Sequence, residues 1–146
     1  MKEKPPKKRP VRQKKVIPKK PPFEYRMLIT PRIDERTKST HTYMAIRTMQ
    51  EFTSFRYDLV VVHKVKQHVL RFDIRGLRAP RLTMPGFGPA IFETKGDHLK
   101  GKFDVVVHKL DKETNVFGVR ITDREVVVEQ RPEKPFIEIV TRMEDW

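Results

Sequence analysis

Apolar and polar residues alternate along most of the chain from residue 23 onward, with the two-residue period of β-strands. The first such run, residues 23–30, places four apolar side chains on one face: Phe23, Tyr25, Met27 and Ile29. Pro31 is expected to end this strand, because proline cannot donate to a ladder of hydrogen bonds. The polar residues 32–40 are then expected to form a loop.

Residues 58–65 and 68–75 form the clearest expected hairpin. A turn at Lys66 and Gln67 would pair residue 65 with 68, 63 with 70, 61 with 72 and 59 with 74. This register places both apolar sets on one face, whereas a slip of one residue would expose one set to water. Arg71 and Arg75 are then expected on the opposite face.

A second hairpin is expected from residues 102–110 and from the strand that contains Phe117, Val119 and Ile121. Its turn is expected over residues 111–115, where Asp111 and Asn115 suit turn conformations. The sequence VVVHKV at residues 60–65 returns as VVVHKL at residues 105–110. This similarity has two interpretations, namely two strands of like composition or a duplicated β unit.

The remaining segments give weaker patterns. Residues 41–56 fit a helix or a strand, and the strand is favoured because clear strands follow. Residues 76–89, from Gly76 to Pro89, contain three glycines and three prolines and predict a long loop that a protein partner could bind. Phe87 lies between two of these glycines and is expected to be exposed. Short strands are expected at residues 90–93, 125–130 and 136–141.

Together these patterns predict an all-β fold, a small sandwich or barrel of about six to eight antiparallel strands. The 146 residues suit a single β-rich domain over residues 23–146, preceded by an extension over residues 1–22.

The extension differs sharply from the domain in composition. Residues 1–22 hold ten lysines and arginines, six prolines and one acidic residue, which gives +9 of the chain's net charge of +13. Prolines and like charges favour an extended path, which at roughly 3 Å per residue lets successive cations meet successive phosphates. The residues expected to contact nucleic acid are Lys7, Lys8, Arg9, Arg12, Lys14, Lys15, Lys19 and Lys20 of this tail, with Arg78 and Arg81 of the glycine- and proline-rich loop.

Candidate catalytic and metal-binding groups are sparse. The chain has no cysteine, and its five histidines show no metal-binding spacing. Ser39 and Ser54 lack the surroundings of a nucleophile elbow. Asp58 and Asp104 precede the two valine runs and could face each other as an acid–base pair, although surface positions are the simpler expectation. We therefore expect no catalytic site, metal or cofactor.

No apolar run approaches the roughly 20 residues that span a bilayer, and no signal sequence is evident, so a cytoplasmic location is expected. The sequence predicts a non-enzymatic protein that associates with RNA or DNA, such as a component of the ribosome or another ribonucleoprotein. The alternative is a structural or protein-interaction β-module, which the tail would tether to an acidic partner or a membrane surface.

Overall fold

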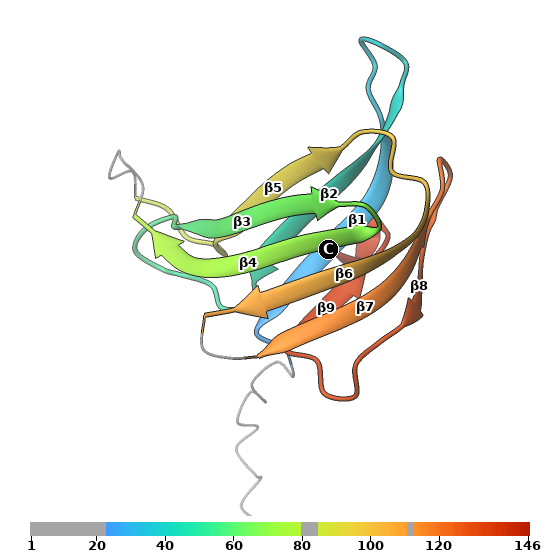
Figure 1. Cartoon of the computed structure of the whole chain (residues 1–146). Coiled ribbons are helices and arrows are strands. Elements are labelled where there is room, and N and C mark those ends of the chain that lie inside the picture. The colour runs from blue at the N-terminus through green and yellow to red at the C-terminus, as the bar shows by residue number, and fades with distance from the viewer. Residues whose placement is uncertain (1–22, 80–84, 111–112) are drawn as a thin grey trace, which may run out of the picture.

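The computed structural model describes residues 23–79, 85–110 and 113–146. Within these residues nine strands form one sheet, which curls until it is nearly closed into a barrel (Figure 1). The strands are β1 (Tyr25–Ile33), β2 (Thr40–Thr48), β3 (Asp58–Lys66), β4 (Val69–Arg78), β5 (Ile91–Gly96), β6 (Gly101–Lys109), β7 (Thr114–Ile121), β8 (Val126–Gln130) and β9 (Ile137–Val140), followed by the 3-10 turn η1 (Met143–Asp145).

The order of the strands in the sheet is β8-β7-β6-β4-β3-β5-β2-β1-β9. The all-β prediction is confirmed, but the expected six to eight antiparallel strands are not what forms. The described sheet has nine strands, and three neighbouring pairs are parallel: β1 with β9, β3 with β5, and β4 with β6. A parallel pair needs a long connection, and the chain between β4 and β6 supplies one that contains β5.

The hairpin of β3 and β4 forms with its expected faces but with a different register. Lys66 lies opposite Val69, so the turn is at Gln67 and His68 rather than at Lys66 and Gln67. Residue 63 therefore pairs with 72 rather than 70, a shift of two residues. Gln67 adopts a left-handed conformation with φ of 54° at the first turn position, as tight hairpin turns require. Because the shift is even, both apolar sets still face inward.

The expected end of the first strand was wrong. β1 continues through Pro31 to Ile33 instead of ending at the proline. Proline is tolerated there because β9 pairs only with Tyr25 to Leu28, so no second ladder is interrupted at Pro31. The loop after β1 is correspondingly shorter than expected. The strand interpretation of residues 41–56 is confirmed as far as Thr48.

Asn115 lies inside β7 rather than in the turn before it. It pairs with Val107 of β6 and is buried. Its Oδ1 atom accepts a hydrogen bond of 2.8 Å from the backbone N–H of Phe136. The side chain therefore ties β7 to the segment that leads into β9. Asp111, the other expected turn residue, lies outside the described residues.

The repeated hexamers lie in β3 and β6, the two neighbours of β4. Aligning them matches Val61 with Val106. Val61 faces the core opposite Ile74, whereas Val106 lies on the outer face between the buried residues Val105 and Val107. Equivalent residues thus point to opposite sides of the sheet. This arrangement favours two strands of like composition over a duplicated unit, because a duplicated strand would keep its inward face.

The main core fills the barrel and includes the fully buried side chains of Met27, Phe72 and Phe117. A smaller apolar cluster lies on the outer face, where Leu28 and Ala45 are cross-strand partners and fully buried. The C-terminal residues reach this part of the sheet. There Arg47 of β2 donates from Nη2 to the carbonyl oxygen of Trp146 at 3.1 Å and lies 5.2 Å from its ring. The C-terminus thus helps to shield the outer face.

Replacing Asn115 with alanine should lower the free energy of unfolding by about 1 to 3 kcal/mol, because the buried N–H of Phe136 loses its acceptor. Urea denaturation would measure this change. Val116→Ala is the matched control at an exposed neighbouring position and should change stability by about 0.5 kcal/mol or less. Equal small effects of the two substitutions would contradict the assigned role of Asn115.

Candidate nucleic-acid interface

Arg78 is the one expected contact residue within the described part of the chain. Arg81 and the eight tail cations (Lys7, Lys8, Arg9, Arg12, Lys14, Lys15, Lys19 and Lys20) lie outside the described residues. Arg78 ends β4 instead of lying in a loop, since the strand extends past Gly76. Its Nη2 is 3.3 Å from Oδ2 of Asp58, and the two side chains are 70% and 57% exposed. Such an exposed pair contributes at most about 1 kcal/mol, which leaves Arg78 available to a phosphate.

The tail joins the domain at this same end of the sheet. Phe23, the first described residue, and Leu77, the neighbour of Arg78, line one apolar pocket of about 540 Å³. The chain is held there by Glu24, whose carboxylate accepts hydrogen bonds of 2.8 and 2.9 Å from Nζ of Lys109. This hydrogen bond raises the pKa of Lys109 above its usual 10.5. Phe23, the first described residue after the +9 segment 1–22, therefore lies at the same end of the sheet as Leu77, the neighbour of Arg78.

A row of cations continues from Arg78 along the outer face of the hairpin. We call it the β3–β4 ridge, and it comprises Lys64, Lys66, Arg71, Arg75 and Arg78, all of which are exposed. Arg71 pairs with Asp73 at 3.1 Å, whereas Lys64, Lys66 and Arg75 form no ion pair with any described residue. The ten residues of β4 span roughly 33 Å. The ridge therefore places five cations along one side of the barrel, two of which, Arg71 and Arg78, are paired with aspartates.

The segment that leads from β4 to β5 adds one exposed aromatic residue. Phe87 is exposed, as expected, with 74% of its surface accessible. The backbone of Gly88 exchanges two hydrogen bonds of 2.8 and 2.9 Å with Phe52, which fixes this part of the loop. Arg56 packs against Gly86, where an added Cβ would lie 3.0 Å from its Cγ. Sequence reasoning missed Arg56, because no periodic pattern places residue 56 beside residue 86.

His63 takes part in the packing of the β3–β4 hairpin. His63 stacks on Phe72 with ring centroids 4.2 Å apart, and its Nδ1 is 2.9 Å from the carbonyl oxygen of Arg71. Burial lowers the pKa of His63 below its usual 6.5. No three His, Asp or Glu side chains converge as a possible metal site within residues 23–79, 85–110 and 113–146.

The two aspartates that could have formed an acid–base pair lie far apart. Asp58 is opposite Arg78 at one end of β4, whereas Asp104 is opposite Val69 at the other end. The interpretation as a catalytic pair was therefore wrong. Strand alternation predicts which face of the sheet a residue occupies. It does not predict which residue of a neighbouring strand lies opposite.

In the described part of the chain, no helix has the length and apolar character needed to cross a membrane. Comparison of the sequence with known protein families and curated proteins, and of the fold with solved structures, yields no match. The surface chemistry of the domain and the composition of the tail are therefore the basis for assigning a function.

Acidification should destabilise the protein through His63. Its folded pKa is lowered, so the unfolded state takes up the proton first and stability falls as the pH drops below about 6.5. Denaturant unfolding at about pH 7.5 and about pH 5.5, a window above the ordinary carboxylate range, should show this loss. His63→Phe keeps an aromatic ring on Phe72 and removes the titration. If this variant lost as much stability on acidification as the unaltered protein, the contribution of His63 would be contradicted.

Proposed function

We propose that the protein is a non-enzymatic, nucleic-acid-associated protein that binds the phosphates of RNA or DNA with its tail and docks with its β domain. The observation that carries this proposal is the concentration of positive charge in the tail and along one hairpin of the domain. The tail carries a net charge of +9, the first described residue after it shares a pocket with Leu77, and the β3–β4 ridge begins at the next residue, Arg78. A component of the ribosome or another cytoplasmic ribonucleoprotein would use such a chain.

The tail supplies affinity without reading sequence. Its lysines act as mobile point charges, while Arg9 and Arg12 can each fork onto two phosphate oxygens. Neutralised phosphates release counterions, and this release drives binding most strongly at low salt.

The domain adds orientation to this affinity. The ridge holds its cations on a rigid hairpin, so they can contact the backbone at fixed positions. Phe87 offers an exposed ring on which a base could stack, and Arg56 packs against Gly86, the residue before it. Stacking tolerates every base, so these contacts favour single strands without selecting a sequence.

Deleting residues 1–22 should abolish most of the binding to single-stranded RNA at physiological salt. If about six phosphates are neutralised, the slope of log affinity against log salt should be about −4 to −5 for the full chain and much shallower for the truncated chain. Fluorescence anisotropy with a labelled RNA would measure both slopes. Circular dichroism would verify that the truncated domain is folded, and unchanged affinity of that domain would contradict the proposal.

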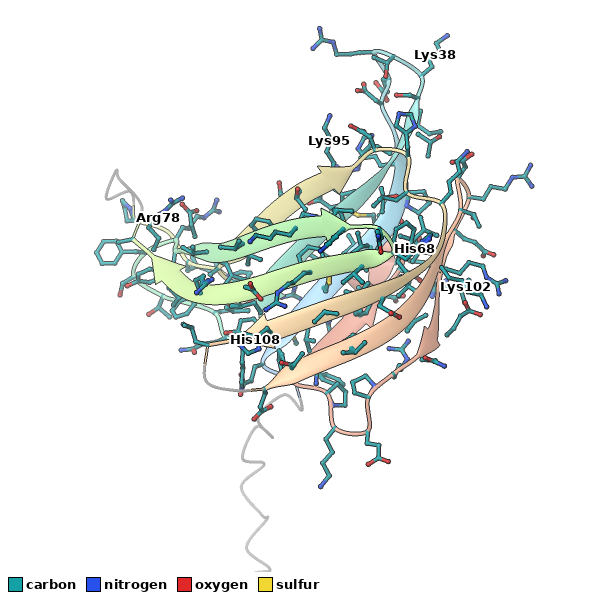
Figure 2. The ribbon with its side chains drawn as sticks, in the orientation of Figure 1. Lys38, His68, Arg78, Lys95, Lys102 and His108 are labelled. Atoms are coloured by element: carbon teal, nitrogen blue, oxygen red, sulfur yellow. The ribbon has the colours of Figure 1, made fainter. Side chains whose placement is uncertain are left out.

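The ridge can be tested independently of the tail. Arg75→Gln combined with Arg78→Gln should weaken binding and make the salt slope shallower by roughly 1 for each phosphate that is no longer neutralised. Lys38→Gln combined with Lys95→Gln is the matched control, because these cations lie in the β1–β2 loop and on β5, away from Arg78 (Figure 2). Equal reductions in the two double variants would show that only net charge matters and would contradict a role for the ridge.

The sheet edges favour a second candidate function, a protein-interaction module tethered by its tail to an acidic partner or surface. β8 and β9 are the two edge strands of the described sheet, and both border a groove of about 640 Å³. Unpaired strand edges can accept a strand from another protein. Residues 76–89 offer another contact region. Binding of this kind would persist at high salt, so the salt titration separates the two functions.

A further inference from the structure

A hollow of about 470 Å³ lies along β6, β7 and β8, at the end of the ridge away from Arg78, and its lining includes the core residues Phe103 and Val119. Its lining includes five polar side chains, namely His68, Lys102, Asp104, Glu129 and Gln130. Figure 2 shows His68, from the turn between β3 and β4, and Lys102, from β6, at this end of the sheet, with Arg78 at the opposite end.

A glycine occupies the middle of a row of three outward positions at this hollow, and the side chain of Gln130 lies against it. Gly118 of β7 pairs with Asp104 on one side and with Gln130 on the other. A side chain at Gly118 would crowd Gln130, whose Cβ and Oε1 would each lie 3.3 Å from an added Cβ. Neighbouring strands lie about 4.8 Å apart, so Asp104 and Gln130 start from backbone positions about 10 Å apart, with the glycine between them.

An irregularity in the sheet coincides with this row. The register between β7 and β8 shifts between Gly118 and Val119, which leaves Glu129 as the extra residue on β8. Bulges change the direction of side chains and are frequent beside functional sites. Here the bulge brings Glu129 and Gln130 to the same hollow. The carboxylate of Glu129 is paired with Arg120 at 3.1 Å, so its charge is already balanced.

The other polar side chains of the hollow combine a negative charge, a positive charge and an amide that are available to a ligand. Asp104 and Lys102 are exposed on the same face of β6, and neither forms an ion pair with any described residue. Asp104 accepts hydrogen bonds through two oxygens, whereas the amide of Gln130 donates and accepts. The ring of His68 lies 5.8 Å from that of Phe103, and the turn is held by the hydrogen bond of 2.8 Å that the N–H of Asp104 donates to the carbonyl oxygen of His68.

We propose that this hollow binds the guanine base of a nucleotide, a proposal that rests on the proposed nucleic-acid function and gives the domain a base preference. Guanine presents N1–H and N2–H side by side, and both can donate to the carboxylate of Asp104. Gln130 donates to O6, and Lys102 contacts the phosphate. The edges of bases in single strands are open to contacts of this kind.

The same groups disfavour the other bases. Adenine places the acceptor N1 where guanine has a donor, and an acceptor opposite the Asp104 carboxylate is repelled. Cytosine and uracil each offer the carboxylate one donor in place of two. Selectivity therefore comes from a paired donor edge that only guanine presents to a carboxylate.

The ridge leads to this hollow. Lys66 pairs with Val69, and Val69 pairs with Asp104, so the last cation of the ridge lies in the same cross-strand row as the carboxylate. A strand that runs from the tail along the ridge would thus bring a base to Asp104. The tail and ridge would hold phosphates, and the hollow would select the base.

The test titrates the full chain with GMP, AMP, CMP and UMP and follows the backbone amide signals of Gly118 and Gln130 by NMR. We expect GMP to shift these signals and to bind about tenfold more tightly than AMP. Asp104→Asn should reduce GMP affinity about tenfold, because the bidentate carboxylate is removed. Asp97→Asn, which removes an exposed carboxylate before β6, is the matched control and should bind GMP normally.

Equal binding of GMP and AMP, or an unchanged GMP affinity in Asp104→Asn, would overturn the guanine site. Comparing GMP with dGMP separates base recognition from ribose recognition, and equal affinities are expected because the proposed interactions are with base and phosphate. Poly(U) distinguishes this proposal from the wider function. Asp104→Asn should keep its salt-dependent poly(U) binding, whereas failure of the unaltered chain to bind poly(U) would contradict the nucleic-acid function itself.

Discussion

The parallel pairing of β4 with β6 is the constraint on which the rest of the structure depends. It places Leu70 beside Val105 and Phe72 beside Val107, so the inward faces of two separate hairpins become one layer of the core. Without this pairing each hairpin would have an uncovered apolar face, and an isolated hairpin is at best marginally stable in water. The same pairing makes the outer faces continuous from β3 to β8, which creates the rows that hold the ridge and the hollow.

The two ends of the barrel have different chemistry as a result. At one end, Glu24 and Lys109 hold the chain just after the tail, and Leu77, the neighbour of Arg78, lines the pocket there. At the other end, the turn at His68 meets β6 beside Asp104. The ridge joins the two ends over roughly 33 Å of β4. The proposed function would use both ends, with charge to hold a polyanion at one end and hydrogen bonds to read a base at the other.

Most strands could be predicted from residue alternation, as could the burial of Phe72 and the exposure of Phe87. The hairpin register could not be predicted in this way. A shift of two residues leaves every side chain on the same face, so alternation does not distinguish the two registers. The place of Asn115 could not be predicted either, since its hydrogen-bond partner, the N–H of Phe136, is 21 residues away in sequence. Within the candidate site, the expected contact role of Arg78 stays a prediction, whereas the ridge as a unit, Arg56 and the hollow could not be predicted from the sequence.

The sequence by itself determined the properties that depend on local order: the faces of the strands, the separation of a basic tail from a less basic domain, and the absence of cysteine chemistry. Only the tertiary structure decided which strands are neighbours, which are parallel and which remain as edges. The physical reason is that alternation specifies a face and says nothing of the strand beside it. Gly118 illustrates the limit, since its neighbours in the sequence do not show that Asp104 and Gln130 flank it in the sheet.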